Sequence, residues 1–394
     1  MTGADVMGDL VILCVNAGSS SLKVAVFSVS RDGSTSQAPP SEPQPREERE
    51  RERWHWSADV DGAPGMAAAV AEALAACRAA GHLDVDAVGH RVVHGGPRHA
   101  SPARIDPALR AELSDLVALA PLHEPAAIAA IDAAAAVLPD VPAVACFDTA
   151  FHATMPVEAA RWALPIDQWE AGVRRYGFHG LSYEYVVDHV GAERLGRSVV
   201  AHLGHGASMC AVAGGRSVDT TMGLTPTGGI VMGTRSGDLD PGVVVHLLRH
   251  SGLDVDGVDH LLNHRSGLLG LSGTTSDMRR LLAAAAGGDD AARLAVDVFC
   301  RAARKQIGAY AAVLGGLDTL VFTGGIGERA AAVRAGIVDG LGFLGLSLDP
   351  ARNRGDEPVI SPDEAPVTVL VVPTDEQRMI ARHTARVVDR VPEP

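Results

Sequence analysis

A run of small and hydroxylated residues lies between two apolar runs near the N-terminus. Residues 11–15 and 22–27 are rich in Val and other apolar residues, which predicts two buried strands. Between them, residues 16–21 can direct backbone N–H groups and hydroxyls at one anion, because small side chains allow close approach of the backbone. Lys23 adds a mobile positive charge of the kind that binds phosphate. The segment indicates a phosphoryl-transfer enzyme, with an ordinary Ser-rich hairpin as the alternative.

Four further windows carry polar side chains that could do chemistry, and three of them lie in or beside glycine turns. Arg91 stands between His90 and the turn at Gly95 and Gly96, Asp148 follows an apolar strand over 141–147, and His179 lies between Phe178 and Gly180. Arg235 lies in the glycine-rich run 232–241. A guanidinium pairs bidentately with carboxylate or phosphate oxygens, and an imidazole can donate to a phosphoryl group. Groups of these kinds can position anionic substrates and stabilise the charge on a transferring phosphoryl group.

These windows resemble the acetate kinase family. Residues 16–23 read Asn-Ala-Gly-Ser-Ser-Ser-Leu-Lys, residues 176–180 read Tyr-Gly-Phe-His-Gly, and the matches run in family order from Val11 to about Ile380. The family belongs to the superfamily of sugar kinases, heat-shock 70 proteins and actin. The resemblance implies an α/β, two-lobed, actin-like (ribonuclease H-like) duplicated fold with a central cleft. It also implies reversible phosphoryl transfer from ATP to acetate, which gives acetyl phosphate and ADP.

The resemblance further implies roles for individual residues. The catalytic residues would be Asp148, His179, Arg235 and His123. Arg91 would bind the acetate carboxylate, and the methyl end would meet Val93, Leu122, Phe178 and Pro226. Asn16 and Glu376 would hold Mg²⁺, with Mn²⁺ as the alternative metal. The residues that would hold ATP or ADP are Lys23, Ser19, Ser21, His202, Leu203, Gly204, His205, Gly206, Asp277, Met278, Arg279, Gly325, Ile326, Gly327, Glu328 and Arg329. A carboxylate is already ionised at pH 7, so Asp148 is expected to orient Mg²⁺ or an Arg rather than to act as a base.

The chain departs from the family pattern at four positions. His205 and Arg329 each stand where the family has Asn, Gly228 where Glu is common, and Asp375 where Asn precedes the magnesium Glu. Three of these positions map to the nucleotide and metal side, so the acceptor is predicted more firmly than the phosphoryl donor. The alternatives are a kinase for propionate or butyrate, a kinase that uses pyrophosphate or polyphosphate, and a weakly active paralogue with a regulatory role.

Length and pattern predict two domains. The 394 residues divide into an N-terminal lobe over 1–150 and a nucleotide-binding lobe over 151–394, whose closing helix over 376–388 is expected to pack back on the first lobe. Residues 30–53 read as a solvated insertion rich in Pro and charge. Helices are predicted over 65–80, 107–120 (with Asp106 as N-cap), 124–138 and 291–314. Strands are predicted over 83–93, 141–147, 199–203, 320–322 and 367–372.

Composition excludes several classes of protein. The net charge of −14 argues against non-specific binding of nucleic acid or acidic membranes. The five cysteines are scattered and form no Cys-x-x-Cys pair, which indicates free thiols in a reducing cytoplasm. The N-terminal residues do not follow the signal-peptide pattern, and no apolar stretch is long enough for a membrane span. The resemblance implies a homodimer.

Overall fold

The computed structural model describes residues 9–18, 21–30, 50–60, 62–82 and 84–389. The chain divides into two compact units. Unit 1 contains the described parts of 1–151, 180–185 and 375–394, and unit 2 contains 152–179 and 186–374. Each unit is built on its own β-sheet.

Unit 1 contains a six-stranded sheet in the order β3-β2-β1-β4-β6-β5. Its strands are β1 (Leu10–Ala17), β2 (Ser21–Val29), β3 (Glu50–Asp59), β4 (Ala87–Val92), β5 (Ala103–Arg104) and β6 (Ala143–Phe147). Strands β1, β2 and β3 form an antiparallel meander, whereas β1, β4 and β6 run parallel to one another. The three parallel strands therefore end at one edge of the sheet.

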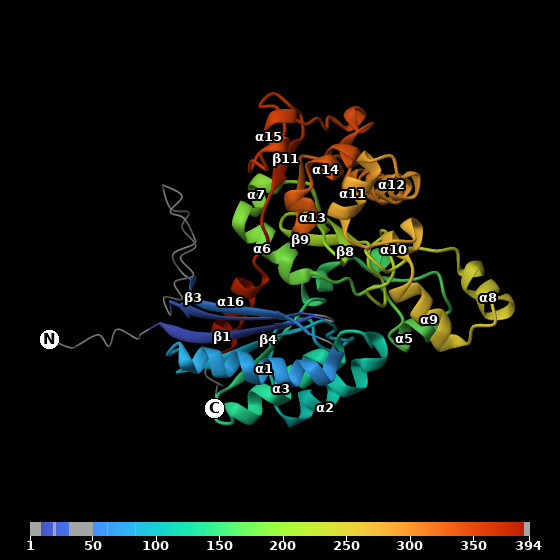
Figure 1. Ribbon diagram of the computed structural model, residues 1–394. Coiled ribbons are helices and arrows are strands. Elements are labelled where there is room, and N and C mark those ends of the chain that lie inside the picture. The colour runs from blue at the N-terminus through green and yellow to red at the C-terminus, as the bar shows by residue number, and fades with distance from the viewer. Residues whose placement is uncertain (1–8, 19–20, 31–49, 61, 83, 390–394) are drawn as a thin grey trace. The chain divides into compact units, whose positions relative to one another are not determined.

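Helices cover both faces of this sheet (Figure 1). Helices α1 (Gly62–Ala79) and α3 (Glu124–Val137) pack on the face that carries Leu13, Val15 and Val88. The C-terminal helix α16 (Glu376–Val388) packs on the face that carries Ile12 and Cys14. The alternation of side chains along a strand sends neighbouring residues of β1 into the two different cores.

Helix α2 (Pro107–Asp115) begins as predicted but ends earlier. The Asp106 side chain accepts a 2.7 Å hydrogen bond from the Leu109 backbone N–H, which confirms the N-cap. The segment predicted as the end of this helix instead forms the 3-10 helix η2 (Leu116–Leu119). The apolar pattern continues through both segments, so periodicity alone did not mark the change.

The end of the segment predicted as a solvated insertion is a strand. Residues 31–49 lie outside the described part of the chain, but residues 50–53 begin β3, which pairs with β2. The half-buried side chains of Trp54 and Trp56 pack against the core under α1 and α3. Aromatic residues suit a half-buried pleated surface, and they hold this charged segment in the sheet.

Unit 2 contains a five-stranded sheet in the order β11-β10-β7-β8-β9. Its strands are β7 (Ser198–Leu203), β8 (Ala207–Ala213), β9 (Arg216–Thr220), β10 (Thr319–Thr323) and β11 (Thr368–Val371). Strands β7, β10 and β11 are parallel, and β8 and β9 extend the sheet as antiparallel hairpins. The long helix α12 (Asp290–Leu314) packs along β7 and β8.

The remaining helices of the chain are short. They are η3 (Ala150–Thr154), α4 (Val157–Ala160), α5 (Ile166–Glu170), α6 (Gly180–Val190), α7 (Ala192–Leu195), α8 (Pro241–His250), α9 (Val255–His264), α10 (Gly267–Ser272), α11 (Met278–Ala286), α13 (Gly324–Arg329), α14 (Ala331–Val338), η4 (Gly342–Leu344) and α15 (Pro350–Arg354). Across the described residues, every helix is too short or too polar to cross a bilayer.

Candidate functional site

Three polar residues stand at the ends of the parallel strands of unit 1. Asn16 lies near the end of β1, Arg91 near the end of β4, and Asp148 directly after β6. In open α/β sheets, ligands bind outside the carboxyl ends of the strands. Glu376 opens α16, which packs against the same three strands. The topology thus brings together four predicted site residues that are up to 360 positions apart in the sequence.

These four side chains form one hydrogen-bonded chain. Arg91 Nε donates to both carboxylate oxygens of Asp148 at 3.1 Å, and its Nη2 donates to Oδ2 at 2.5 Å. Arg91 Nη1 donates to Asn16 Oδ1 at 3.2 Å, and Asn16 Nδ2 donates to Glu376 Oε2 at 2.8 Å. Asp148 and Asn16 therefore fix the orientation of the Arg91 guanidinium. These bonds do not use all five of its N–H groups, and the others can donate to a substrate.

Burial makes this chain electrostatically strong. The Asp148 side chain is fully buried and the Arg91 side chain is 13% exposed. Burial would lower the pKa of Arg91, but the carboxylates of Asp148 and Glu376 raise it by more, so the pKa lies above its ordinary value. Arg91 is a permanent cation at the strand ends, which suits the binding of an anionic carboxylate.

The loop after β4 is held by the start of α3. His123 is the N-cap residue of α3 and is buried, and Glu124 follows it with no exposed surface. Glu124 Oε1 accepts a 2.7 Å hydrogen bond from the His94 backbone N–H. Burial raises the pKa of Glu124 to about 8, with the charge of Asp148 as a smaller contribution. His123 thus lies beside a carboxyl group that is largely protonated at neutral pH.

In unit 2, His179 has an unusual backbone conformation. Its φ of 58° is left-handed, which is uncommon for a residue other than glycine. Its Nδ1 lies 2.8 Å from Ser208 Oγ, and its ring stacks on His202 with the ring centroids 4.2 Å apart. Strained backbone persists where the surroundings hold it in place. The strain and the two ring contacts fix the direction in which Nε2 points.

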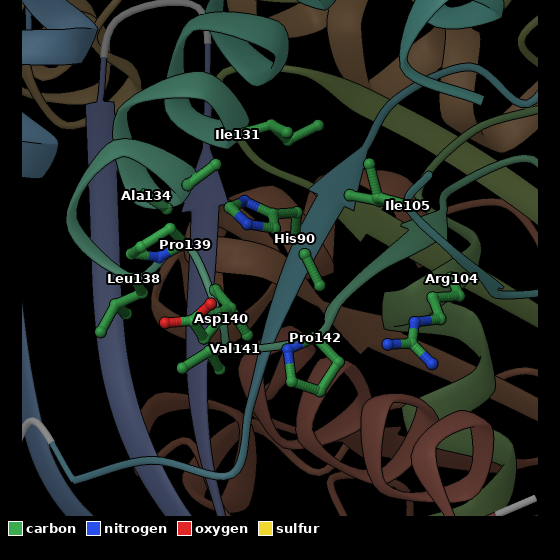
Figure 2. A pocket seen from close by; sticks show the side chains of 13 residues that line it. His90, Arg104, Ile105, Ile131, Ala134, Leu138, Pro139, Asp140, Val141 and Pro142 are labelled. Atoms are coloured by element: carbon green, nitrogen blue, oxygen red, sulfur yellow. The ribbon is translucent and has the colours of Figure 1, made fainter. Parts of the chain in front are cut away.

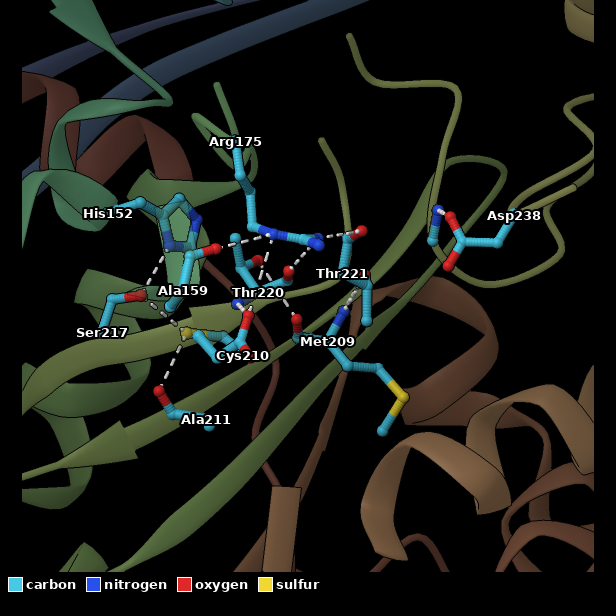
Figure 3. Close-up of polar contacts among 12 residues, drawn as sticks. His152, Ala159, Arg175, Met209, Cys210, Ala211, Ser217, Thr220, Thr221 and Asp238 are labelled. Carbon is cyan, nitrogen blue, oxygen red and sulfur yellow. Dashed lines mark hydrogen bonds and ion pairs between the residues drawn. The ribbon is translucent and has the colours of Figure 1, made fainter. Parts of the chain in front are cut away.

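A buried polar network anchors the segment before His179 (Figure 3). Arg175 Nη1 donates to the carbonyls of Thr220 and Thr221 at 2.7 and 3.0 Å. His152 lies 2.8 Å from Ser217 Oγ and 3.0 Å from the Phe178 carbonyl. Because a carbonyl only accepts, His152 must donate from Nε2 to Phe178. These contacts tie residues 175–178 to β9 and so position His179.

Arg235 lies close to His179 across a glycine. A Cβ on Gly206 would stand 3.1 Å from Arg235 Nη2 and 3.5 Å from His179 Nε2. Arg235 is 8% exposed, and its Nη1 donates to the Pro226 carbonyl at 2.7 Å. Two predicted catalytic groups of unit 2 therefore converge on the β7–β8 turn. A larger residue at 206 would press on both of them.

His205 occupies the same turn. Its ring lies so close to Gly233 that a Cβ there would stand 2.6 Å from Nδ1. Partial burial, followed by the charge of Arg235, lowers the pKa of His205. Burial and the Arg235 cation both disfavour protonation, so in the protein alone the ring is mainly neutral at pH 7.

The predicted nucleotide segments fall at neighbouring strand ends. Strand β10 pairs in parallel with β7, with Thr323 opposite His202. The turn His202–Gly206 and the segment Gly325–Arg329 of α13 therefore follow adjacent strands. Gly324 permits the tight entry into α13 with a φ of 74° and its Cα close to the Leu203 backbone. Glu328 Oε1 accepts a 3.2 Å hydrogen bond from the Thr374 backbone N–H.

Asp277 and Arg279 already have a structural task. Asp277 caps α11 by accepting from the Arg279 backbone N–H at 2.8 Å, and its carboxylate pairs with Arg279 Nη2 at 2.7 Å. The side-chain hydrogen bond from Arg279 lowers the pKa of Asp277 to about 2. Met278 is buried, whereas the Arg279 side chain is 90% exposed. Of the three, Arg279 has the most surface to offer a ligand.

The other predicted residues are spread over both units. Val93 is buried and Leu122 half-buried in unit 1, and Phe178 and Pro226 are buried in unit 2. Because β4 ends at Val92, strand alternation does not by itself place Val93 on the side of Arg91. The predicted phosphate loop is a β1–β2 hairpin. Its members Lys23 (exposed) and Ser21 (half-buried) are described, and Ser19 lies outside the described residues.

Two residues that contact the site were not predicted from the sequence. Ser208 is fully buried and holds the His179 ring, and Glu124 holds the His94 backbone. Ser208 pairs with His202 across the β7–β8 hairpin, so the short turn between them was an available signal. Glu124 has no comparable signal, because its partner lies 30 residues away.

Comparisons with known proteins agree with this arrangement. The model of the acetokinase family matches residues 11–382. The acetate kinase of Leifsonia xyli is 50% identical over 316 residues, which cover 77% of this chain and 79% of that protein. The acetate kinase structure from Porphyromonas gingivalis has a TM-score of 0.79 at 37% identity and covers 96% of this chain and all of that one. A propionate kinase structure from Francisella tularensis has a TM-score of 0.81 at 34% identity, with the same coverage.

These likenesses confirm two predictions. The structural matches run over nearly the whole chain and confirm the predicted α/β fold class. The family match extends over almost the same span that the sequence motifs indicated. The chain belongs to the acetate kinase, or acetokinase, family.

Proposed function

We propose that the protein catalyses reversible, Mg²⁺-dependent transfer of the γ-phosphoryl group of ATP to acetate. A carboxylate oxygen of acetate forms the new bond to phosphorus as the bond from phosphorus to the β–γ bridging oxygen breaks, and the products are acetyl phosphate and ADP. The observation that carries the proposal is the fixed Arg91 guanidinium at the strand ends, held by Asp148 and Asn16. Membership of the family supplies the reaction class.

Arg91 binds the acetate carboxylate in this proposal. Its remaining N–H groups can pair with a carboxylate, and Asp148 keeps the guanidinium in place without taking part as a base. Arg235 and His179 stabilise the charge on the transferring phosphoryl group, since both are fixed and lie close to Gly206. His123, beside the buried Glu124, has a supporting role at the acetate side.

Asn16 and Glu376 are the residues that would hold Mg²⁺. Amide and carboxylate oxygens are the ligands that this ion prefers, and because Mg²⁺ retains several waters, two protein ligands suffice; Mn²⁺ suits the same donors. When bound, the metal neutralises phosphate charge. In the protein alone the Asn16 amide nitrogen donates to Glu376 Oε2 at 2.8 Å and the amide oxygen accepts from Arg91, so the Asn16 amide would have to turn to offer its oxygen to the metal beside Glu376.

ATP is the proposed phosphoryl donor. The turn His202–Gly206 and the segment Gly325–Arg329 would hold the phosphates and the nucleoside together with Arg279. Lys23, Ser21 and Ser19 would extend the phosphate contacts from the β1–β2 hairpin.

Two of the four departures from the family pattern have local structural explanations. Asp375 caps α16, as Asn would, but its carboxylate also pairs with Arg378 Nε at 2.9 Å. A Cβ on Gly228 would stand 3.3 Å from Asp238 Oδ1, so Gly228 avoids placing a second carboxylate there.

Acetate is the proposed acceptor, and propionate is the closest competitor. Val93, Leu122, Phe178 and Pro226 are apolar, and one methylene in such a pocket is worth about 1–3 kcal/mol. Val93→Ala is expected to raise the ratio of kcat/KM for propionate over acetate. An unchanged ratio would place Val93 outside the pocket.

A homodimer in the cytoplasm completes the proposal. Helix α8 has no buried residue, and its apolar side chains Val243, Val245 and Leu248 are 39–44% exposed, which supports coverage of this helix by a second copy. The five cysteines are buried and unpaired, as in a reducing compartment. Light scattering after gel filtration tests the dimer, with Leu248→Glu expected to give monomers.

The experiment that tests the proposal is a hydroxamate assay of the purified protein with acetate and Mg²⁺. ATP, pyrophosphate and polyphosphate are compared as donors. We expect acetyl hydroxamate with ATP and none without a donor. Product with pyrophosphate alone would overturn the choice of donor, and no product with any donor would indicate the regulatory paralogue.

A further inference from the structure

A cavity of about 240 Å³ lies within unit 1, on the face of the sheet that α3 covers (Figure 2). Its walls come from α3, from the loop that follows it and from strands β4, β5 and β6. Ile105, Ile131, Leu138 and Val141 are apolar side chains of its walls, and they share the lining with polar groups. An apolar protein cavity of roughly 150 Å³ is large enough to bind benzene, so this one can take a somewhat larger molecule.

One polar side chain lies at the cavity wall among the apolar groups. His90 is 2% exposed and lines the cavity, and Figure 2 shows its ring between Ile131, Ala134 and Ile105. Among the described residues, neither Nδ1 nor Nε2 of His90 has a hydrogen-bond partner. Buried polar groups in proteins are almost always hydrogen-bonded. The ring therefore offers one N–H and one lone pair to whatever occupies the cavity.

The cavity is separate from the Arg91 site. His90 and Arg91 are neighbours on β4, so their side chains project from opposite faces of the sheet. His90 shares its face with Val88 and faces α3, whereas Arg91 contacts Asn16 and Asp148. A ligand of the cavity would not occupy the proposed acetate site, and the inference does not depend on the proposed function.

We propose that this cavity binds a small uncharged molecule with an apolar body and one hydroxyl group, for which His90 is the polar anchor. A hydroxyl both donates and accepts, so it satisfies either nitrogen of a neutral imidazole. Burial lowers the pKa of His90 to about 4, so the ring is neutral at pH 7 and provides no counter-charge for an ion. Exposed charges of both signs, Arg104 and Asp140, are among the lining residues, so the rim selects for neither sign.

Phenol is the probe that tests this site, with toluene and benzoate as comparisons of similar size. Calorimetry on the full chain should give saturable binding of phenol at one site. Toluene lacks the hydroxyl and should bind about tenfold more weakly, because the imidazole then stays unpartnered. Benzoate should bind more weakly than phenol, because its carboxylate would lose hydration beside the neutral His90 ring and Arg104 is exposed at the rim.

Three variants locate the binding. His90→Leu keeps an apolar side chain of similar size and should weaken phenol binding by about tenfold without weakening toluene binding. Ala134→Met extends into the cavity and should abolish the binding of both. Ala136→Met is the matched control, because Ala136 is exposed on the same helix and does not line the cavity. It should bind phenol as the parent does.

A measurement on the parent protein tests the proposal even if a variant fails to fold. The imidazole ¹⁵N signals of His90 should shift as phenol is added, because a new hydrogen bond changes the ring nitrogens. Saturable binding with the shift, lost in His90→Leu, supports the site. No saturable binding to the folded parent, an unmoved His90 signal, or equal phenol affinity in His90→Leu would each overturn it.

Discussion

Arg91 and Asp148 form a forked ion pair at the ends of two adjacent parallel strands. The Arg91 Nη2 to Asp148 Oδ2 distance is 2.5 Å, and the Asp148 side chain has no exposed surface. Removing one partner of such a pair leaves the other charge buried and uncompensated, which costs about 3–5 kcal/mol. A substitution at Arg91, the proposed acetate-binding residue, is therefore expected to lower the stability of the fold as well as the binding of acetate.

This link decides how Arg91 should be tested. Arg91→Ala is expected to raise the KM for acetate but also to destabilise the fold through Asp148. Arg91→Lys keeps the charge and loses the planar fork, so it should raise the KM for acetate by about tenfold or more with a smaller loss of stability. Steady-state kinetics at saturating ATP, together with urea unfolding, separates the two effects. An unchanged KM in folded Arg91→Lys would place the carboxylate elsewhere.

Arg235 should matter for turnover more than for binding. Arg235→Leu removes a charge that acts mainly in the transition state, so kcat should fall by a factor on the order of a thousand or more while the KM for acetate changes little. Arg301→Leu is a suitable control, because Arg301 is exposed on α12. Near-normal turnover in folded Arg235→Leu would remove this residue from the mechanism.

The protonation of His205 should appear in the nucleotide affinity. Phosphates would favour the protonated ring, but burial and Arg235 lower the pKa of His205 below 6.5. The affinity for ADP should therefore fall as pH rises above that lowered pKa, until the ring is neutral in the complex as well. Calorimetry across this range measures it.

His205→Asn should give a level profile throughout, because Asn does not titrate. His250→Asn, on the exposed surface of α8, should keep the parental profile. Identical profiles for parent and His205→Asn would show that His205 does not contact the phosphates.

Glu124 should make the protein less stable at alkaline pH. Its pKa is about 8 in the folded state against an ordinary 4.5, so its contribution to stability is complete below about 4.5 and is lost as pH rises through 8. Glu124→Gln keeps an acceptor for the His94 N–H and cannot ionise. The difference in unfolding free energy between Glu124→Gln and the parent should therefore grow in favour of the variant from pH 5 to pH 8. A difference that stays constant with pH would mean that Glu124 is not a buried acid.

Sequence reasoning predicted local features better than contacts between distant segments. The Asp106 N-cap, the strand that carries Arg91 and the strand that precedes Asp148 follow from short-range patterns. The sequence did not predict strand β3. Residues 31–49 separate it from its partner β2, and its charged residues suggested a solvated segment. The His179–Ser208 contact depends on a chain separation of 29 residues, which no local period records.

The electrostatics of the site depended still more on the fold. The identity of His205 was evident from the motif, but the direction of its pKa required the position of Arg235. Glu124 looked like an ordinary residue of the first turn of a helix, yet its complete burial gives it the pKa of a weak acid. Burial is set by packing between elements, and for that reason these two properties could not be read from residue types.

The central claim is that a carboxylate oxygen of acetate attacks the γ-phosphorus of ATP. The most direct measurement is ³¹P NMR of the acetyl phosphate formed from ATP and acetate labelled with ¹⁸O in its carboxylate. If the claim is right, the product phosphorus carries the isotope shift of one bridging ¹⁸O, and ADP appears in equal amount. ADP without labelled acetyl phosphate would contradict the claim, because the phosphoryl group would then have gone to water or to another acceptor.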